Sequence, residues 1–355
     1  MKKLLFIFIL FLLFLTTSFL LVYNYNTSAV NGDNTITITI EQGSTFSSIG
    51  SLLEENELIK SEFFYKIYIK INSPTSLQAG PYELNQNMSV EEIIEVLSNG
   101  NTHNPDAITI TFNEGLNMRS IAQIIEDNTT NTYEEVFALL EDNEYLNDLI
   151  EEYWFITDEI LNDEIYYPLE GYLFPNTYSF SNDEISIKSI FETMLNEMEI
   201  KLFDYKEDIM NSDYTFHELI TMASIVELEA AASDDRAGVA GVFYNRLEDN
   251  WSLGSDVTTY YAEKIDMSDR DLYVSELNDE NAYNTRSSSM AGKLPVGAIC
   301  NPGLESIKSS IYPSDHSYFY FVADINKETY FTTTYSEHLS KVEELQEAGL
   351  WYYYD

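Results

Sequence analysis

Two segments of the chain combine the alternating pattern of a β-strand with the spacing of an amphipathic helix. Ile36–Ile40 reads Ile-Thr-Ile-Thr-Ile and predicts a strand with one buried face. After a turn at Gly43, the apolar positions of Ser44–Glu55 recur at helical spacing. The same order recurs in Ile108–Phe112, a turn at Gly115 and a helix. The apolar positions of that second helix are Met118, Ile121, Ile124 and Ile125. The pattern therefore predicts two strand–turn–helix openings, each of which begins a separate domain of the chain.

The first opening begins a small domain, predicted over residues 35–100. Residues 78–84 predict a turn into a second strand. Ser89–Leu97 predicts a helix, because Ser89 and Glu92 have the spacing of a capping box ahead of apolar residues. The segment 99–106 is rich in Asn, Gly and Pro, which is typical of a domain boundary.

The second region, residues 107–355, mixes helical patterns with aromatic strands such as Tyr318–Val322. Another capping box, Thr215–Glu218, predicts a largely apolar helix that runs to about Ala231. Helices and strands do not alternate regularly here, so the pattern predicts an α+β fold rather than a parallel α/β sheet.

An apolar run from Leu4 to Val22 occupies the N-terminus. A membrane-spanning helix needs about 20 apolar residues, and no clear cleavage site follows the run. Lysines precede the run and acidic residues follow it. This pattern favours an uncleaved single-pass anchor over residues 1–23 in the cell membrane, with a cytoplasmic N-terminus and an extracytoplasmic body. A cleaved signal peptide and a buried core helix are the alternatives. Residues 24–34 are polar and predict a short tether.

Composition excludes several classes of protein. The chain has 355 residues, with 60 acidic and 18 basic side chains and a net charge of −42. Such a charge disfavours binding to nucleic acid, which needs Lys and Arg to neutralise phosphates. Hydrophobic residues make up 45% of the chain, enough to form packed cores, so the acidity does not indicate disorder.

Cysteine and histidine content argues against a metal site. Cys300 is the one cysteine in the sequence, which rules out an intrachain disulfide and a thiolate cage. His217-Glu218 begins like a zinc-binding HExxH motif, but Thr221 stands where the second His belongs. We therefore expect no metal and no cofactor.

Glu227 is the candidate catalytic residue. On the predicted helix it shares a face with small or apolar residues, among them Ile220, Ala223, Ser224 and Ala231. Partial desolvation on such a face raises the pKa of a carboxyl group, as a general acid for glycosidic cleavage requires. The alternative is an ordinary surface glutamate, a serious one in a chain with 60 acidic residues.

A series of short motifs follows in order along the second region. They are Leu169–Tyr178, Ala223–Glu227, Val242–Leu247, Leu253–Thr258, Tyr283–Thr285, Leu294-Pro295, Ile299–Gly303, Tyr320–Ala323 and Glu337-His338. In this order they resemble the YceG-like (MltG) family of endolytic murein transglycosylases. The resemblance covers nearly the whole chain. It implies a membrane helix, a small LysM-like α/β domain and a larger α+β catalytic domain.

The resemblance implies that Glu227 is the catalytic acid/base of a lytic transglycosylase. Such an enzyme cuts the β-1,4 bond between N-acetylmuramic acid and N-acetylglucosamine without water and leaves a 1,6-anhydro end. It would act on peptidoglycan glycan strands beside wall-synthesis proteins. Other residues would bind substrate or support the site: Glu170, Tyr178, Glu229, Arg236, Asn245, Asp256, Thr258, Tyr283, Asn284, Thr285, Asn301, Glu337 and His338. Glu229 is the second candidate for the acid, and Arg236 is a candidate partner of Glu229 or of an anionic stem peptide.

The sequence departs from the family pattern in three places. Asp256-Val257-Thr258 replaces the usual Asp-Pro-Thr, Gly292–Ile299 lacks two of the usual prolines and has an extra Lys, and Thr329 replaces a His. These changes leave two other functions open. One is a glycan-binding scaffold with little turnover, and the other is a structural, membrane-tethered partner of wall-synthesis enzymes.

Overall fold

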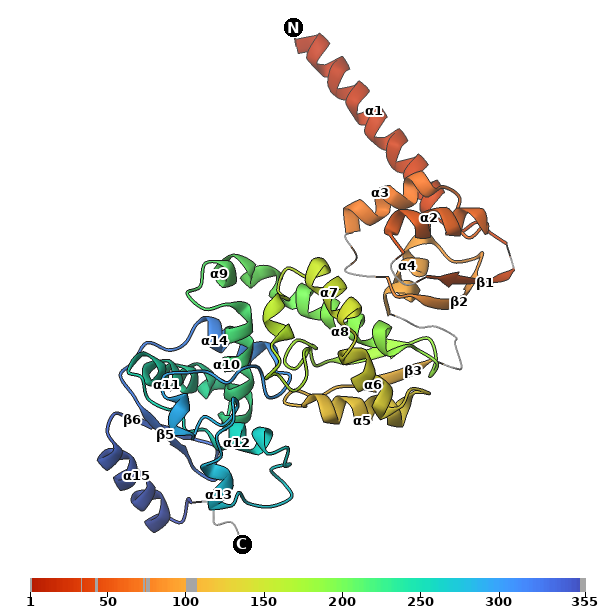
Figure 1. Cartoon of the computed structure of the whole chain (residues 1–355). Coiled ribbons are helices and arrows are strands. Elements are labelled where there is room, and N and C mark those ends of the chain that lie inside the picture. Colours follow the sequence, from red (N-terminus) through yellow and green to blue (C-terminus); the bar gives the residue numbers. More distant parts are fainter. Residues whose placement is uncertain are drawn as a thin grey trace. The chain divides into compact units, whose positions relative to one another are not determined.

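The computed structural model describes residues 2–32, 34–41, 44–72, 74, 77–99 and 107–351, with the side chains of 2–13 and 99 left out (Figure 1). The predicted turn at Gly43 and residues 100–106 of the predicted boundary lie outside the described residues. The chain divides into two compact units, residues 1–109 with 178–183 and residues 110–177 with 184–355. The mixed content of helices and small sheets confirms the α+β prediction.

The chain begins with helix α1, Lys2–Thr27. This helix includes the first residues of the predicted tether, because two polar side chains bond back to carbonyls of the preceding turn. Asn26 Nδ2 donates to Val22 O at 2.8 Å and Thr27 Oγ1 donates to Tyr23 O at 3.0 Å. Within the described residues, no helix has both the length and the apolar character needed to cross a membrane.

The first unit contains a two-stranded antiparallel sheet covered by helices. Its elements are β1 (Thr35–Ile40), α2 (Phe46–Glu55), α3 (Glu62–Asn72), β2 (Gly80–Asn85) and α4 (Val90–Asn99). The register places Ile38 opposite Tyr82, and both side chains lie in the core. The predicted capping box of α4 is confirmed, since Ser89 N–H donates to Glu92 Oε2 at 2.8 Å and Glu92 N–H to Ser89 Oγ at 3.2 Å.

The second strand–turn–helix opening is also confirmed. Strand β3, Ile108–Thr111, leads to helix α5, Met118–Asn128. Between them Gly115 has a φ of +80°, a conformation that a Cβ atom disfavours. Strand β3 pairs with β4, Thr177–Phe180, a partner that the alternation pattern does not identify.

Helices form most of the remaining regular secondary structure. Those before the central helix are α6 (Tyr133–Leu140), α7 (Asn143–Glu152), α8 (Ile187–Leu202) and α9 (Lys206–Met210). Those that follow are α10 (Phe216–Glu229), α11 (Arg236–Glu248), α12 (Asp256–Ala262), α13 (Val274–Leu277), α14 (Leu304–Ile311) and α15 (Tyr335–Glu347). Single 3₁₀ turns occur at Asp158–Leu161, Phe203–Tyr205, Ser233–Asp235 and Ser288–Met290.

Helix α10 lies at the centre of the second unit. The predicted capping box is present, because Thr215 and Glu218 each bond the other's backbone N–H. Every residue from Phe216 to Val226 is buried apart from Glu218, since α10 packs against α11, α12 and α14. The helix ends at Glu229, so Ala231 is not on it and does not share the face of Glu227 as predicted.

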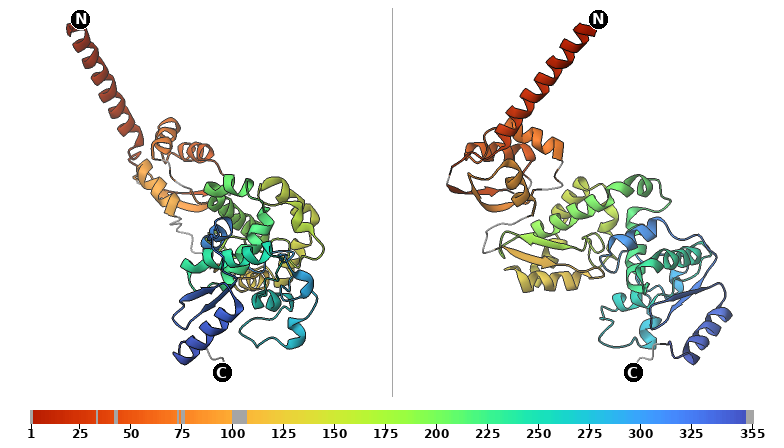
Figure 2. Two further views of the ribbon diagram at one scale, coloured as in Figure 1. Left: turned by 90° about the vertical axis from the view of Figure 1, so that its left-hand side faces the viewer. Right: turned by 180° about the vertical axis from the view of Figure 1, so that it is seen from behind.

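A small hairpin with a helix beside it closes the second unit (Figure 2). Strands β5 (Tyr320–Ala323) and β6 (Thr329–Thr332) are antiparallel, and α15 packs against both. The strand predicted from Tyr318 begins two residues later. The backbone carbonyl of Tyr318 does not take part in the hairpin. It accepts a hydrogen bond from Asn245 Nδ2 at 2.8 Å.

Candidate active site

Glu227 lies in the last turn of α10 and is held from two directions. Arg236 Nη2, at the start of α11, donates to Glu227 Oε1 at 2.8 Å. Gly303 N–H and Ser306 Oγ, at the start of α14, donate to Oε2 at 3.0 and 2.7 Å. The positive end of the α14 dipole therefore faces the carboxylate. The side chain is 7% exposed, so the predicted desolvation is present.

These contacts have a clear chemical consequence. A guanidinium, a hydroxyl and a backbone N–H that all donate to one carboxyl group stabilise its ionised form. Desolvation alone would favour the neutral acid. The site around Glu227 therefore combines burial with strong donors.

A second carboxylate, Glu114, lies next to this cluster. Its Oε2 is 3.9 Å from Arg236 Nη2, and its side chain is 52% exposed. A Cβ atom on Gly303 would lie 2.0 Å from Glu114 Oε1, so the carboxyl group fills the space that the glycine leaves. Burial raises the pKa of Glu114, and the negative charges of Glu227 and Glu305 raise it further.

Glu114 is absent from the residues predicted for the site. The signal that identifies it is the turn of the second opening, Asn113-Glu114-Gly115, which brings an acidic side chain to the end of a strand. Gly115 N–H donates to Asn301 O at 2.9 Å and Asn301 N–H to Leu116 O at 2.8 Å. These paired backbones place Glu114 against Gly303.

Arg236 was predicted to pair with Glu229 or with an anionic stem peptide, and the structure pairs it with Glu227 rather than Glu229. Glu229 lies two residues further along α10 and accepts a short hydrogen bond from Ser255 Oγ. Burial raises the pKa of Glu229, and the hydrogen bond from Ser255 opposes that change. Glu227 and Glu229 thus occupy separate surroundings.

Glu170 is fully enclosed and accepts hydrogen bonds from neutral donors only. Met118 N–H and Tyr261 OH donate to Oε2, each at 2.9 Å, and Asn301 Nδ2 donates to Oε1 at 3.0 Å. Burial raises the pKa of Glu170 to about 7, although these bonds oppose the rise. Asn301 Oδ1 also accepts from the backbone N–H groups of Gly171 and Leu173, each at 3.0 Å. Glu170 and Asn301 therefore hold the loops around Glu227 in place.

Four more predicted residues form internal hydrogen bonds beside α12. Thr258 and Thr285 are buried, and their hydroxyl oxygens lie 2.8 Å apart. Asn284 Oδ1 accepts from Thr259 Oγ1 at 2.7 Å, and Tyr283 OH accepts from Tyr166 N–H at 3.1 Å. Their polar groups are directed into the protein.

Asp256 differs from these neighbours, because its side chain is 51% exposed. It forms an ion pair with Arg286, whose side chain is 38% exposed. The pair lies one residue from Ser255, which binds Glu229. Asp256 is therefore accessible to a substrate, unlike the buried predicted residues beside α12.

The remaining predicted residues lie elsewhere. Tyr178 is buried on β4. Asn245 Nδ2 donates to His316 O at 2.9 Å and so fixes the segment before β5. Glu337 caps α15, because Thr334 N–H donates to its Oε2 at 3.0 Å. His338 stacks on Tyr320 with 5.5 Å between ring centroids, and burial lowers its pKa.

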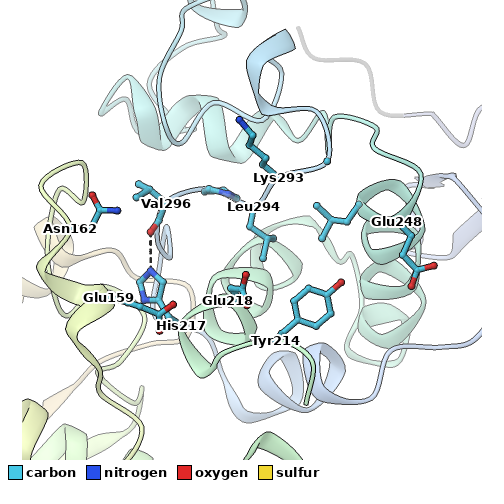
Figure 3. A pocket seen from close by; sticks show the side chains of 12 residues that line it. Glu159, Asn162, Tyr214, His217, Glu218, Glu248, Lys293, Leu294 and Val296 are labelled. Atoms are coloured by element: carbon cyan, nitrogen blue, oxygen red, sulfur yellow. Dashed lines mark hydrogen bonds between the residues drawn. The ribbon is translucent and has the colours of Figure 1, made fainter. Parts of the chain in front are cut away.

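A pocket of about 560 Å³ opens at the other end of α10 (Figure 3). His217, Glu218 and Lys293–Val296 line it, the last of these within the loop that departs from the family pattern. His217 is fixed between Tyr172 OH and Val296 O, at 2.8 Å from each. Ten residues of helix separate His217 from Glu227, a rise of about 15 Å. The pocket is therefore distinct from the Glu227 cluster.

No group of three or more His, Cys, Asp or Glu side chains within the described part of the chain is arranged to hold a metal ion. Cys300 is buried, and its Sγ donates to Ser224 O at 3.3 Å.

Sequence and structure comparisons identify the class of protein. The sequence model of the YceG-like family matches residues 38–344. An endolytic murein transglycosylase of Bacillus subtilis (strain 168) is 37% identical over 305 residues, which cover 86% of this chain and 83% of that protein. A protein of the same name from Streptococcus pneumoniae serotype 2 is 32% identical over 88% of this chain and 59% of its own length.

A crystal structure of a YceG-like protein from Listeria monocytogenes superimposes with a TM-score of 0.61 at 31% identity. The match covers 87% of this chain and all of that one. The chain belongs to the YceG-like family.

Proposed function

We propose that the protein is an endolytic lytic transglycosylase that cleaves peptidoglycan glycan strands, with Glu227 as its catalytic acid/base. The proposal rests on one observation. The carboxyl group of Glu227 is buried and accepts hydrogen bonds from Arg236 and from the start of α14. It occurs in a chain whose relatives are named endolytic murein transglycosylases. That name supports the enzyme class, and the burial and hydrogen-bond donors of Glu227 support its choice as the acid.

The proposed reaction has two proton transfers and consumes no water. Protonated Glu227 gives its proton to the oxygen between N-acetylmuramic acid and N-acetylglucosamine, and the glycosidic bond breaks. The carboxylate then takes the proton of the muramyl 6-hydroxyl, whose oxygen closes on C1. The products are a new N-acetylglucosamine hydroxyl and a 1,6-anhydro end. Glu227 is protonated again at the end.

The hydrogen-bond donors around Glu227 suit the stage of the reaction between the two proton transfers. After the first transfer the carboxylate is ionised beside a positively charged sugar. Arg236, Ser306 and Gly303 N–H stabilise it in that state because all three donate to it. We propose Asp256 as a substrate contact because its side chain is exposed. The buried predicted residues then support the loops.

The cellular setting is part of the proposal. We propose that the apolar run from Leu4 to Val22 anchors the protein in the cell membrane with its body outside. The domain over residues 35–100 is proposed to be LysM-like and to contact glycan. In that position the enzyme would end nascent strands beside wall-synthesis proteins. Recovery of the full chain in the soluble fraction of cells would contradict the anchor.

Product mass tests the reaction. The full chain in mild detergent is incubated with purified peptidoglycan, and the released fragments are weighed by mass spectrometry. Anhydro ends, each lighter by one water than a reducing end, are expected. Water-added reducing ends would instead indicate a hydrolase. Binding of glycan without any release would favour the alternative function of a glycan-binding scaffold.

A further inference from the structure

Two carboxylates lie on one guanidinium at the end of α10. Arg236 Nη2 is 2.8 Å from Glu227 Oε1 and 3.9 Å from Glu114 Oε2. The first contact is a hydrogen bond, and the second is an ion pair at longer range. One guanidinium therefore lies within ion-pair range of two carboxylates, and a rotation of its side chain would decide which of them it binds. Arg236 is 15% exposed, so bulk water screens this choice only weakly.

Glu114 lies against the backbone of Gly303, next to Glu227. Its carboxyl group fits against Gly303, where any Cβ atom would collide with it. The same Gly303 donates its N–H to Glu227 at 3.0 Å. Gly303 thus contacts both carboxylates, because Glu227 accepts from its N–H and the Glu114 carboxyl group occupies the place of its missing Cβ atom.

We propose that Glu114 is a positioning residue for the acid: it competes with Glu227 for Arg236 and thereby sets how readily Glu227 takes up the proton that it later donates. An ionised Glu114 draws the guanidinium away and adds a negative charge beside Glu227. Both effects favour the protonated form of Glu227. When Glu114 is neutral, Arg236 pairs with Glu227 alone, and this pairing favours the ionised form of Glu227. This inference rests on the proposed role of Glu227.

The charged groups near Glu114 are few. Arg236 faces it from α11, Glu227 from α10 and Glu305 from α14. Glu305 has its own partner, because Lys308 Nζ donates to it at 2.9 Å. Glu305 therefore provides a matched control, since it is a neighbouring carboxylate of equal charge whose ion pair is with Lys308 rather than with Arg236.

The test is the pH profile of anhydro-end formation by the full chain. A general acid must be protonated, so the rate falls on the alkaline side of the profile. Glu114→Gln is expected to move this alkaline limb to lower pH by about 1 unit, the lower end of the range for a neighbouring charge. Gly303→Ala, which displaces the Glu114 carboxyl group, is expected to move it in the same direction. Glu305→Gln is expected to move it less than Glu114→Gln does.

Three results would overturn the inference. They are an unchanged profile for Glu114→Gln, an equal shift for Glu305→Gln, and a further shift when Gly303→Ala is added to Glu114→Gln. Thermal unfolding of each variant shows whether its fold is kept, and a merely structural role would lower the rate at all pH values alike. If Glu227→Gln is inactive and the Glu114→Gln profile is unshifted, only this inference fails. An active Glu227→Gln variant overturns the proposed function as well.

Discussion

Two buried carboxylates of the same unit, Glu227 and Glu170, have opposite surroundings. Glu227 accepts from a guanidinium, a hydroxyl and a helix N-terminus, and a second carboxylate lies nearby. Glu170 accepts from an amide side chain, a phenol and a backbone N–H, and among the described residues no cation forms an ion pair with it. The first arrangement favours a charged carboxylate, whereas the second raises the pKa of Glu170 to about 7, so that this carboxyl group is about half protonated at pH 7.

The difference shows that burial alone does not identify a catalytic acid. Glu170 is the more deeply buried of the two and its pKa is raised to about 7, which is the value expected of a general acid. Yet it is enclosed by the loops that it joins, at 3% exposure. Glu227 lies at a helix end with an exposed carboxylate beside it. Substitutions of the two carboxylates separate these roles.

The largest effect is expected for Glu227→Gln, which keeps the shape of the side chain and removes its proton chemistry. The rate of anhydro-end formation should fall by about 10²–10⁴-fold, the usual contribution of a positioned acid or base. The same assay with Glu170→Gln is the matched comparison. If Glu170→Gln alone were inactive at unchanged stability, the acid would have to be reassigned.

Glu170→Ala should act on the fold instead. It leaves the donors of Met118 and Tyr261 buried without an acceptor and removes one of the two bonds from Asn301 Nδ2, so the free energy of unfolding should fall by about 3 kcal/mol. Urea denaturation measures this change. A loss below about 1 kcal/mol would show that water enters and replaces the carboxylate.

Glu170 should also make stability depend on pH. Its pKa is about 7 in the folded protein, above the ordinary value of 4.5, so the native state binds the extra proton between these values. The stabilisation is full below pH 4.5 and is lost as the pH rises through 7. The difference in unfolding free energy between the wild type and Glu170→Gln should shrink over this range. A constant difference would mean that Glu170 is ionised throughout.

The smallest effect is expected for Ser255→Ala, which removes the hydrogen bond to Glu229. If Glu229 only orients the end of α10, the rate should fall by roughly fivefold, equivalent to about 1 kcal/mol. Thr259→Ala, which removes a hydroxyl that bonds Asn284 instead, is the control. A loss as large as that of Glu227→Gln would make Glu229 part of the chemistry.

The local elements could be predicted because their patterns are periodic over short stretches. The alternation of Ile36–Ile40 gives β1, and the apolar spacing after Gly115 gives α5. Capping boxes locate the starts of α4 and α10. Strand β4 was not predicted because its pairing with β3 joins segments about 70 residues apart, and such a contact leaves no local period.

The candidate acid could be identified, but its surroundings could not. The motif around Glu227 and the helix beneath it are readable from the sequence, and Arg236 lies only nine residues away. Its pairing with Glu227 rather than Glu229 depends on how α11 leaves the end of α10. Gly303 and Ser306 reach Glu227 only because α14 packs against α10.

The sequence by itself determined the family, the two strand–turn–helix openings and the candidate acid, because these depend on motifs and periods that neighbouring residues share. The tertiary structure decided which carboxylate has ionic partners and which has neutral ones. It also brought Glu114 to Arg236 through the paired backbones at Gly115 and Asn301. Those contacts join residues far apart in the chain, so packing alone sets them.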